Sequence, residues 1–327
     1  MAYQQVGTPR FYINVIEWLD SIGFDTQVPA ARYHTLPVVS YEMFGRDNPV
    51  FPENTFSRGQ NDFYALLGHN ISQNGENFTL ASVTVPAASI GGGYNISDII
   101  NIASSPQYDG FSMASMDIPP ETTTVETASS SSGNWQFHVG SIILGTFYDM
   151  PHSPDLSLSM SREYGGTKTI ETRGGASLSN TMWTKSPQWQ GKGAWELSSE
   201  GSPPNQELSR SGRRIWDLSF SYLDQGDVWG SNQMLNTLRE DFSDGLDDAD
   251  TGSGTSNYEY TLLTDNSFYS QVIHKTNGGQ LPFIFQPDNA NSNAQDFAIC
   301  KFDQKSFQFN QTAPGLYNAK LKIRECW

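Results

Sequence analysis

The chain has 327 residues, and its 35 acidic against 19 basic residues give a net charge of −16. Proteins that bind nucleic acid or anionic membranes neutralise phosphates with surplus Lys and Arg, so this balance argues against a DNA-, RNA- or membrane-binding role. Aromatic residues make up 13% of the sequence, and 29 Gly and 17 Pro interrupt it. This composition is typical of a β-dominated protein with long loops.

The N-terminal region contains no targeting signal that we recognise. Residues 1–10 lack a basic segment followed by an apolar one, which a secretory signal peptide requires. No apolar run in the chain approaches the ~20 residues of a membrane span. We therefore expect synthesis in a cytoplasm and no membrane partner.

A short helix is predicted at 14–22. Asn14 suits the N-cap, Glu17 falls at the capping-box position, and the apolar residues that follow have helical spacing. A strand at 11–16 is the alternative. Beyond residue 28 the chain is rich in Pro and loops, so residues 1–118 are interpreted as a loop-rich β domain or an insertion.

Residues 119–133, PPETTTVETASSSSG, form the clearest change of composition. Such a tract buries too little apolar surface to offset the entropy lost on ordering, which predicts a linker or an exposed loop. Residues 134–327 are then expected to form a second, antiparallel β domain.

Strand patterns are dense in that second part. The segment 215–222 alternates, with Trp216, Leu218, Phe220 and Tyr222 expected on one face. A helix is predicted at Ser231–Asp241. Hairpin turns are predicted at 164–168, joining strands at 156–160 and 168–172, and at Gly174–Gly175. Further strands are expected at 142–147, 281–285, 297–302 and 306–309.

The C-terminal segment 316–327 also alternates, with Tyr317, Ala319, Leu321 and Ile323 on one face. Period-two alternation of this kind indicates a half-buried strand tied into a sheet. The pattern as a whole predicts a mainly β protein. We expect an antiparallel sandwich or barrel with one or two short helices and long loops.

Two cysteines are present, Cys300 and Cys326. Pairing between neighbouring strands is one interpretation. The preferred one is two reduced cysteines that behave as small hydrophobic residues.

No cluster of polar residues has the spacing of a known catalytic or metal site. Carboxylates between Glu240 and Asp250 could hold Ca²⁺, but the EF-hand order is absent, and a solvated acidic loop is preferred. His152, Ser153 and Asp155 are adjacent, yet a turn explains them better than a triad, which is built in space. The other histidines, at 34, 69, 138 and 274, have no ligand spacing.

Exposed tryptophans beside paired carboxylates can mark glycan hydrolysis. Five tryptophans are candidates for a sugar site, although core packing is the default for those in alternating strands: Trp183, Trp189, Trp195, Trp216 and Trp229. No pair of Asp or Glu stands out beside them. We therefore expect no enzymatic activity, no catalytic or metal-binding residues and no cofactor.

Two regions together resemble structural proteins of tailed bacteriophages. They are FYDMPHSPDLSLSMSREYGGTKTIETRGG at 147–175, and GGQLPFIFQPD at 278–288 followed by 317–327. The resemblance is to tail-tip or baseplate proteins of the distal-tail type. Such proteins commonly end on a strand of the form apolar-x-apolar-x-acidic-x-Trp, as Leu321, Ile323, Glu325 and Trp327 do here.

This resemblance implies a tail-tube-like β fold with a packed helix and a homo-oligomeric ring, expected to contain six copies. The ring would join the tail tube to hub and fibre proteins in the virion, after assembly in the bacterial cytoplasm. A second hypothesis is a receptor-binding, carbohydrate-binding or glycan-degrading tail fibre or spike component, which rests on the aromatic content.

Overall fold

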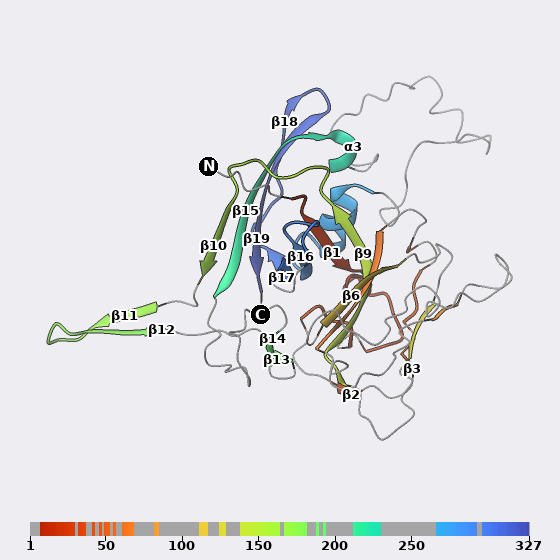
Figure 1. The fold of residues 1–327 in the computed structure, drawn as a ribbon, viewed down its shortest axis with the longest axis horizontal. Helices are drawn as coiled ribbons and strands as arrows, with labels where there is room; N and C mark the ends of the chain where they lie inside the picture. The colour runs from red at the N-terminus through yellow and green to blue at the C-terminus, as the bar shows by residue number, and fades with distance from the viewer. Residues whose placement is uncertain are drawn as a thin grey trace.

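A computed structural model describes the chain in residues 7–29, 32–36, 41–42, 46–47, 49–52, 55–56, 61–68, 82–84, 111–116, 124–128, 138–163, 167–181, 188–189, 192–193, 212–229, 266–292 and 296–326. The protein is mainly β, and every pairing between the described strands is antiparallel, which confirms the predicted fold class. Figure 1 shows a large twisted sheet from which a thin two-stranded arm projects.

The main sheet has ten strands. Nine follow one another in the order β10 (Ser159–Glu163), β15 (Arg213–Asp224), β19 (Leu316–Glu325), β17 (Ala298–Phe302), β16 (Phe283–Gln286), β1 (Arg10–Asn14), β9 (Ser141–Asp149), β4 (Asn61–Leu67) and β6 (Phe111–Met116). The tenth, β18 (Phe309–Ala313), pairs with β19. Because β10 and β6 do not pair with each other, the sheet is open and sandwich-like rather than a closed barrel.

Short strands form four smaller sheets among the described residues. They are β2 (Tyr41–Glu42) with β8 (His138–Val139), β3 (Arg46–Asp47) and β5 (Ser82–Thr84) with β7 (Thr124–Ala128), β11 (Thr167–Glu171) with β12 (Ser177–Thr181), and β13 (Gln188–Trp189) with β14 (Lys192–Gly193). Strand β11 therefore pairs with β12, whereas β10 pairs with β15. The predicted hairpin across residues 164–168 is wrong, and the predicted turn at Gly174–Gly175 joins β11 to β12 as expected.

The predicted boundary at 119–133 does not divide the main sheet. Strands β1 and β4 come from residues 1–118 and pair directly with strands from residues 134–327, and β6, from the same part of the chain, pairs with β4. Strand β7 lies within the segment predicted as a linker. The composition of a segment indicates how much apolar surface it can bury. It does not indicate which distant strands the residues on either side of that segment will pair with.

Aromatic side chains fill the core on both faces of the central strands. On one face Phe11 is fully buried, with ring centroids 5.2 Å from Phe285, 5.6 Å from Phe283, 5.7 Å from Phe268 and 5.9 Å from Phe302. On the other face Tyr12 packs edge-on against Phe63 at 4.9 Å. Since successive side chains of a strand point to opposite faces, β1 contributes to two cores at once.

Helix α1 (Val15–Ser21) begins where the sequence predicts it. The side chain of Asn14 accepts a hydrogen bond from the backbone N–H of Glu17, as a capping residue does. The Glu17 carboxylate accepts from the backbone N–H of Thr35 at 2.9 Å and from its hydroxyl at 2.6 Å. This buried carboxylate therefore ties residues 32–36 to the start of the helix.

The other helical segments are short: α3 (Gln225–Val228), the π-helix η3 (Tyr269–Ile273) and the 3₁₀-helix η4 (His274–Thr276). The last two carry buried polar groups. Gln271 accepts from Lys275 Nζ at 2.7 Å and from the Thr146 hydroxyl at 3.3 Å. The helix predicted at Ser231–Asp241 lies outside the described residues.

Strand β19 matches the predicted C-terminal strand. Tyr317, Ala319, Leu321 and Ile323 are all buried, while Lys320 between them is exposed. The strand pairs with β15 along one edge and with β17 and β18 along the other. It is therefore an interior strand of the sheet, whose backbone hydrogen bonds are made on both sides.

A buried ion pair joins three of these strands. Arg214 Nη2 lies 3.0 Å from Glu325 Oε1, and the Arg214 backbone N–H donates to Glu325 Oε2 at 2.9 Å. Arg214 Nη2 also donates to the Phe297 carbonyl at 2.7 Å, just before β17. Both side chains are at most 10% exposed. Removing one member of such a pair leaves the other charge buried without its partner.

The two cysteines are free, as the preferred interpretation expects. Cys300 contributes to the core with Phe11, whereas Cys326 packs against the core with Tyr12, so the two side chains lie on opposite faces of the sheet. Burial raises the pKa of the Cys300 thiol, and it raises that of Cys326 to about 12. Both thiols are therefore protonated and poorly nucleophilic at neutral pH.

We predict that Glu325→Ala lowers the free energy of unfolding by about 3–5 kcal/mol, because Arg214 is left charged inside the protein. The matched control is Glu163→Ala, which removes an ion pair to Arg324 whose side chains are 35–45% exposed. We expect that control to change stability by about 1 kcal/mol or less. Denaturant unfolding of the two variants measures the difference, and equal effects would contradict the structural role given to Glu325.

Candidate functional site

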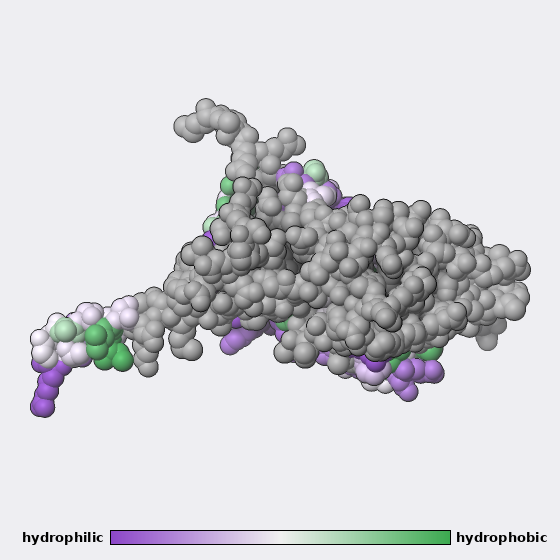
Figure 2. All heavy atoms as spheres, turned by 60° about the horizontal axis from the view of Figure 1, so that its bottom comes forward, coloured by the Kyte–Doolittle hydropathy of each residue, from purple (hydrophilic) through white to green (hydrophobic). Residues whose placement is uncertain are grey.

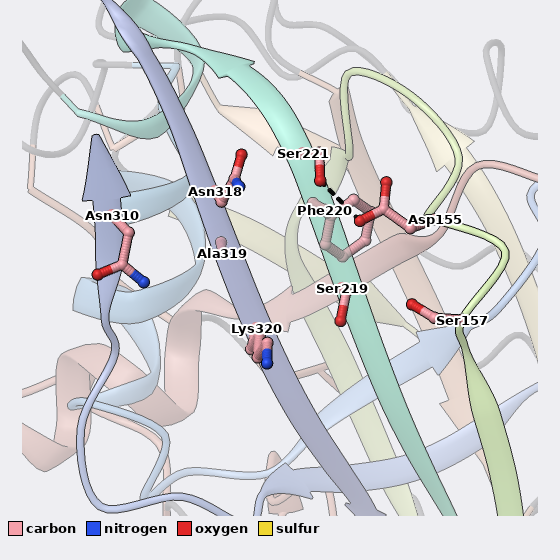
Figure 3. Close-up of a pocket in the computed structure, with 9 residues that line it drawn as sticks. All are labelled: Asp155, Ser157, Ser219, Phe220, Ser221, Asn310, Asn318, Ala319 and Lys320. Carbon is pink, nitrogen blue, oxygen red and sulfur yellow. Dashed lines mark hydrogen bonds between the residues drawn. The ribbon is translucent and has the colours of Figure 1, made fainter. Parts of the chain in front are cut away.

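A polar groove lies on the outer face of the sheet, over strands β15 and β19. It encloses about 300 Å³ and is lined by Asp155, Ser157, Ser219, Phe220, Ser221, Asn310, Asn318, Ala319 and Lys320. Figure 3 shows that these side chains come from four segments: the loop before β10, and strands β15, β18 and β19. Segments far apart in the sequence thus meet at one surface.

Strand alternation explains why the groove is polar. Phe220 and Ala319 face each other across β15 and β19 and point into the core. Their chain neighbours Ser219, Ser221, Asn318 and Lys320 therefore point outward. In Figure 3 the Phe220 ring lies behind β15, on the core side of the strand.

The wall formed by the loop is fixed by two hydrogen bonds. The Asp155 backbone N–H donates to the Ser219 carbonyl at 2.8 Å. The Ser221 hydroxyl donates to Asp155 Oδ2 at 2.8 Å, the dashed contact in Figure 3. Asp155 therefore fixes the loop to the strand, and its second carboxylate oxygen has no hydrogen-bond partner among the described residues.

A β-bulge interrupts β15 beside the groove. The register shifts between Phe220 and Leu223, so that both of these residues are buried while Ser221 and Tyr222 share the outer face. The prediction that Tyr222 shares the core face with Trp216, Leu218 and Phe220 is therefore wrong for Tyr222. An extra residue in a strand reverses the inward and outward alternation of the residues that follow it. This bulge contains no glycine that would have indicated it in the sequence.

Tyr222 has an unusual backbone for an aromatic residue. Its φ is 63°, in the left-handed region that favours glycine. Its backbone N–H donates to Asn318 Oδ1 at 3.2 Å, and its side chain is 72% exposed. The protein thus holds a large aromatic ring in solvent at a position where the backbone conformation is unfavourable.

His152 is not part of a catalytic triad with Ser153 and Asp155. Its Nδ1 lies 2.8 Å from the backbone carbonyl of Ser153, while Asp155 is bonded to Ser221. Its ring packs 6.0 Å from that of Phe220. The three residues lie in a bend that leads into the groove wall, and no Ser–His–Asp chain of hydrogen bonds connects them.

The remaining candidates weighed from the sequence are dispersed. His34 lies 3.8 Å from Glu17, and His274 packs against Trp18, where burial followed by the charge of Lys275 lowers its pKa. Trp216 is a core residue, and Trp229 is partly buried against the same core. Trp183, Trp195 and the acidic segment Glu240–Asp250 lie outside the described residues.

Within the part of the chain that the structure describes, no three His, Cys, Asp or Glu side chains are grouped so as to hold a metal ion. Among the described helices, none is both long enough and apolar enough to cross a membrane. The groove itself offers hydroxyl, amide, carboxylate and ammonium groups. These groups can form hydrogen bonds to a polar ligand. Among the lining residues, Asp155 is the one carboxylate, and it accepts a hydrogen bond from the Ser221 hydroxyl.

A scan against protein-family models and searches of curated proteins and of solved structures found no match to this chain.

We predict that Tyr222→Gly leaves the protein as stable as the wild type or slightly more so, because glycine adopts positive φ without strain. Tyr222→Val should lower stability by about 1 kcal/mol, since a β-branched side chain fits this conformation worse. The control is Asp217→Gly, at an exposed position of β15 with negative φ, where glycine should destabilise by about 0.5–1 kcal/mol. Thermal unfolding of the three variants gives the order of their stabilities. If Tyr222→Gly lost as much stability as Asp217→Gly, the backbone strain inferred at Tyr222 would be contradicted.

Proposed function

We propose that this chain is a structural subunit of the tail tip of a tailed bacteriophage and that it works by assembling with copies of itself into a ring. The first support is the resemblance of residues 147–175, 278–288 and 317–327 to distal-tail-type proteins. These residues contribute to β9, β10, β11, β16 and β19. Four of these strands belong to the main sheet, and the fifth begins the projecting arm.

The observation that carries the proposal is the arm formed by β11 and β12. These two strands pair only with each other among the described strands. Figure 1 shows the arm extending away from the sheet, and in Figure 2 its coloured atoms stand out as a projection at the left. A two-stranded hairpin is marginally stable in water on its own, so a partner surface that covers it would stabilise it.

The arm carries an apolar pair suited to such a partner. Ile170 and Leu178 are opposite each other across the two strands, and their side chains are 57% and 61% exposed. Cross-strand neighbours lie on the same face of a hairpin. The two residues therefore form one apolar patch on a projecting element.

The partner we propose for the arm is the next copy of the chain. An arm that contacts a different surface on its neighbour makes a heterologous contact, and such contacts close into rings when the rotation between copies allows it. The expected ring has six copies and joins the tail tube to hub and fibre proteins. Assembly of this kind requires no catalysis and no cofactor.

We predict that the double substitution Ile170→Ser and Leu178→Ser prevents ring formation while the folded subunit keeps the wild-type melting temperature, because neither side chain is buried within the subunit. Ile22→Ser serves as the control, since Ile22 is 55% exposed at the end of α1, away from the arm. Native mass spectrometry of the full chain over a concentration series counts the copies. Assembly of the double variant equal to that of the wild type would refute the role of the arm.

Location in the particle is the direct test of the proposed function. Electron microscopy of the intact particle, with an antibody against this chain, should label the tail tip. Labelling of the capsid shell would overturn the proposal, as would hydrolysis of a glycan by the purified chain. A subunit that stays monomeric in solution but is found in the tail tip would show that other tail proteins initiate the ring.

A further inference from the structure

The groove over β15 and β19 has unused hydrogen-bonding capacity of both kinds. Asn318 uses its Oδ1 to accept from Tyr222, and Asn310 uses its Oδ1 to accept from Gln308, so both amide N–H₂ groups remain as donors. Asp155 uses one carboxylate oxygen for Ser221, and the other remains as an acceptor. A fitting ligand must therefore present donors and acceptors close together.

The charges of the groove favour a neutral ligand. Asp155 and Lys320 are both among its lining residues and stand on opposite sides of β15 in Figure 3. One carboxylate and one ammonium cancel, so neither an anion nor a cation gains a net attraction in the groove. The amides and serine hydroxyls between them are neutral.

Tyr222 is adjacent to two lining residues of the groove, and its side chain is 72% exposed. It follows Ser221 on the same face of the bulge, and its backbone is tied to the lining residue Asn318. An exposed ring in a strained conformation adds nothing to the core. Strain of this kind is concentrated at functional sites, where another interaction makes up for it.

A pyranose sugar combines hydroxyl groups, which both donate and accept hydrogen bonds, with a flat C–H face. Its hydroxyls match the amides and the carboxylate, and its C–H face matches an aromatic ring. The groove volume of about 300 Å³ lies at the lower end for ligand pockets, which suits one sugar unit of a longer chain.

We propose that this groove binds a neutral carbohydrate, with one sugar unit stacked on Tyr222 and hydrogen-bonded to Asp155, Asn310 and Asn318. The site is one for recognition, since glycoside hydrolysis generally uses two carboxyl groups, and Asp155 is the one carboxylate among the lining residues. The inference does not depend on the proposed tail function, because a subunit that forms no ring would still contain the groove.

The test uses the full chain and saturation-transfer NMR with linear tetrasaccharides of glucose, galactose and N-acetylglucosamine, and with tetragalacturonate as an anionic comparison. We expect at least one neutral tetrasaccharide to bind. Tyr222→Phe should keep the affinity within roughly threefold, and Tyr222→Gly should weaken it by roughly tenfold or more, as truncation of a central aromatic contact does. Ile22→Ser, at the C-cap of α1, should bind as the wild type.

Tyr222→Gly is the decisive variant because glycine suits the local backbone, so a loss of binding would not be a loss of folding. Three results would overturn the proposal: no neutral tetrasaccharide bound at about 10 mM, equal binding by Tyr222→Gly and the wild type, or preference for tetragalacturonate. Sugar binding by a chain that antibody labelling places outside a phage tail would refute the proposed function and leave this inference standing.

Discussion

The position of β19 between β15 and β17 is the constraint on which the rest of the sheet depends. Its Tyr317, Ala319, Leu321 and Ile323 supply the core face, and the Glu325 carboxylate near its end holds Arg214 of β15. Arg214 in turn donates to the Phe297 carbonyl just before β17. A single buried guanidinium therefore links three strands, and a buried charge that needs all its partners tolerates little change in their register.

The same pairing creates the outer surface. Once Phe220 and Ala319 are directed inward, their neighbours must face solvent, and these are serines, asparagines and a lysine. The bulge after Phe220 then returns Leu223 to the core and turns Tyr222 outward. The pairing register of β15 and β19 thus decides both the packing of the core and the polar character of the groove. The extra residue in the bulge decides which side chains belong to each.

The two surfaces proposed for function are built in different ways. The arm of β11 and β12 is a local hairpin that presents an apolar pair and receives no support from other described strands. The groove is rigid, because it lies on paired strands and its loop wall is held by hydrogen bonds at 2.8 Å. A projecting apolar element suits assembly with a neighbour, and a polar surface fixed by hydrogen bonds suits recognition of a small neutral ligand.

The sequence by itself determined the features that depend on residues within a few positions of one another. These are the helix cap at Asn14 and Glu17, the turn at Gly174–Gly175, and the alternation of β19. Only the tertiary structure decided which strands pair. Strand β1 lies between β9 and β16, although these lie more than 120 residues away along the chain, and β10 pairs with β15 rather than with its neighbour β11. The bulge at Tyr222 and the groove beside it depend on that pairing, because a strand's own pattern does not record where its partner's register slips.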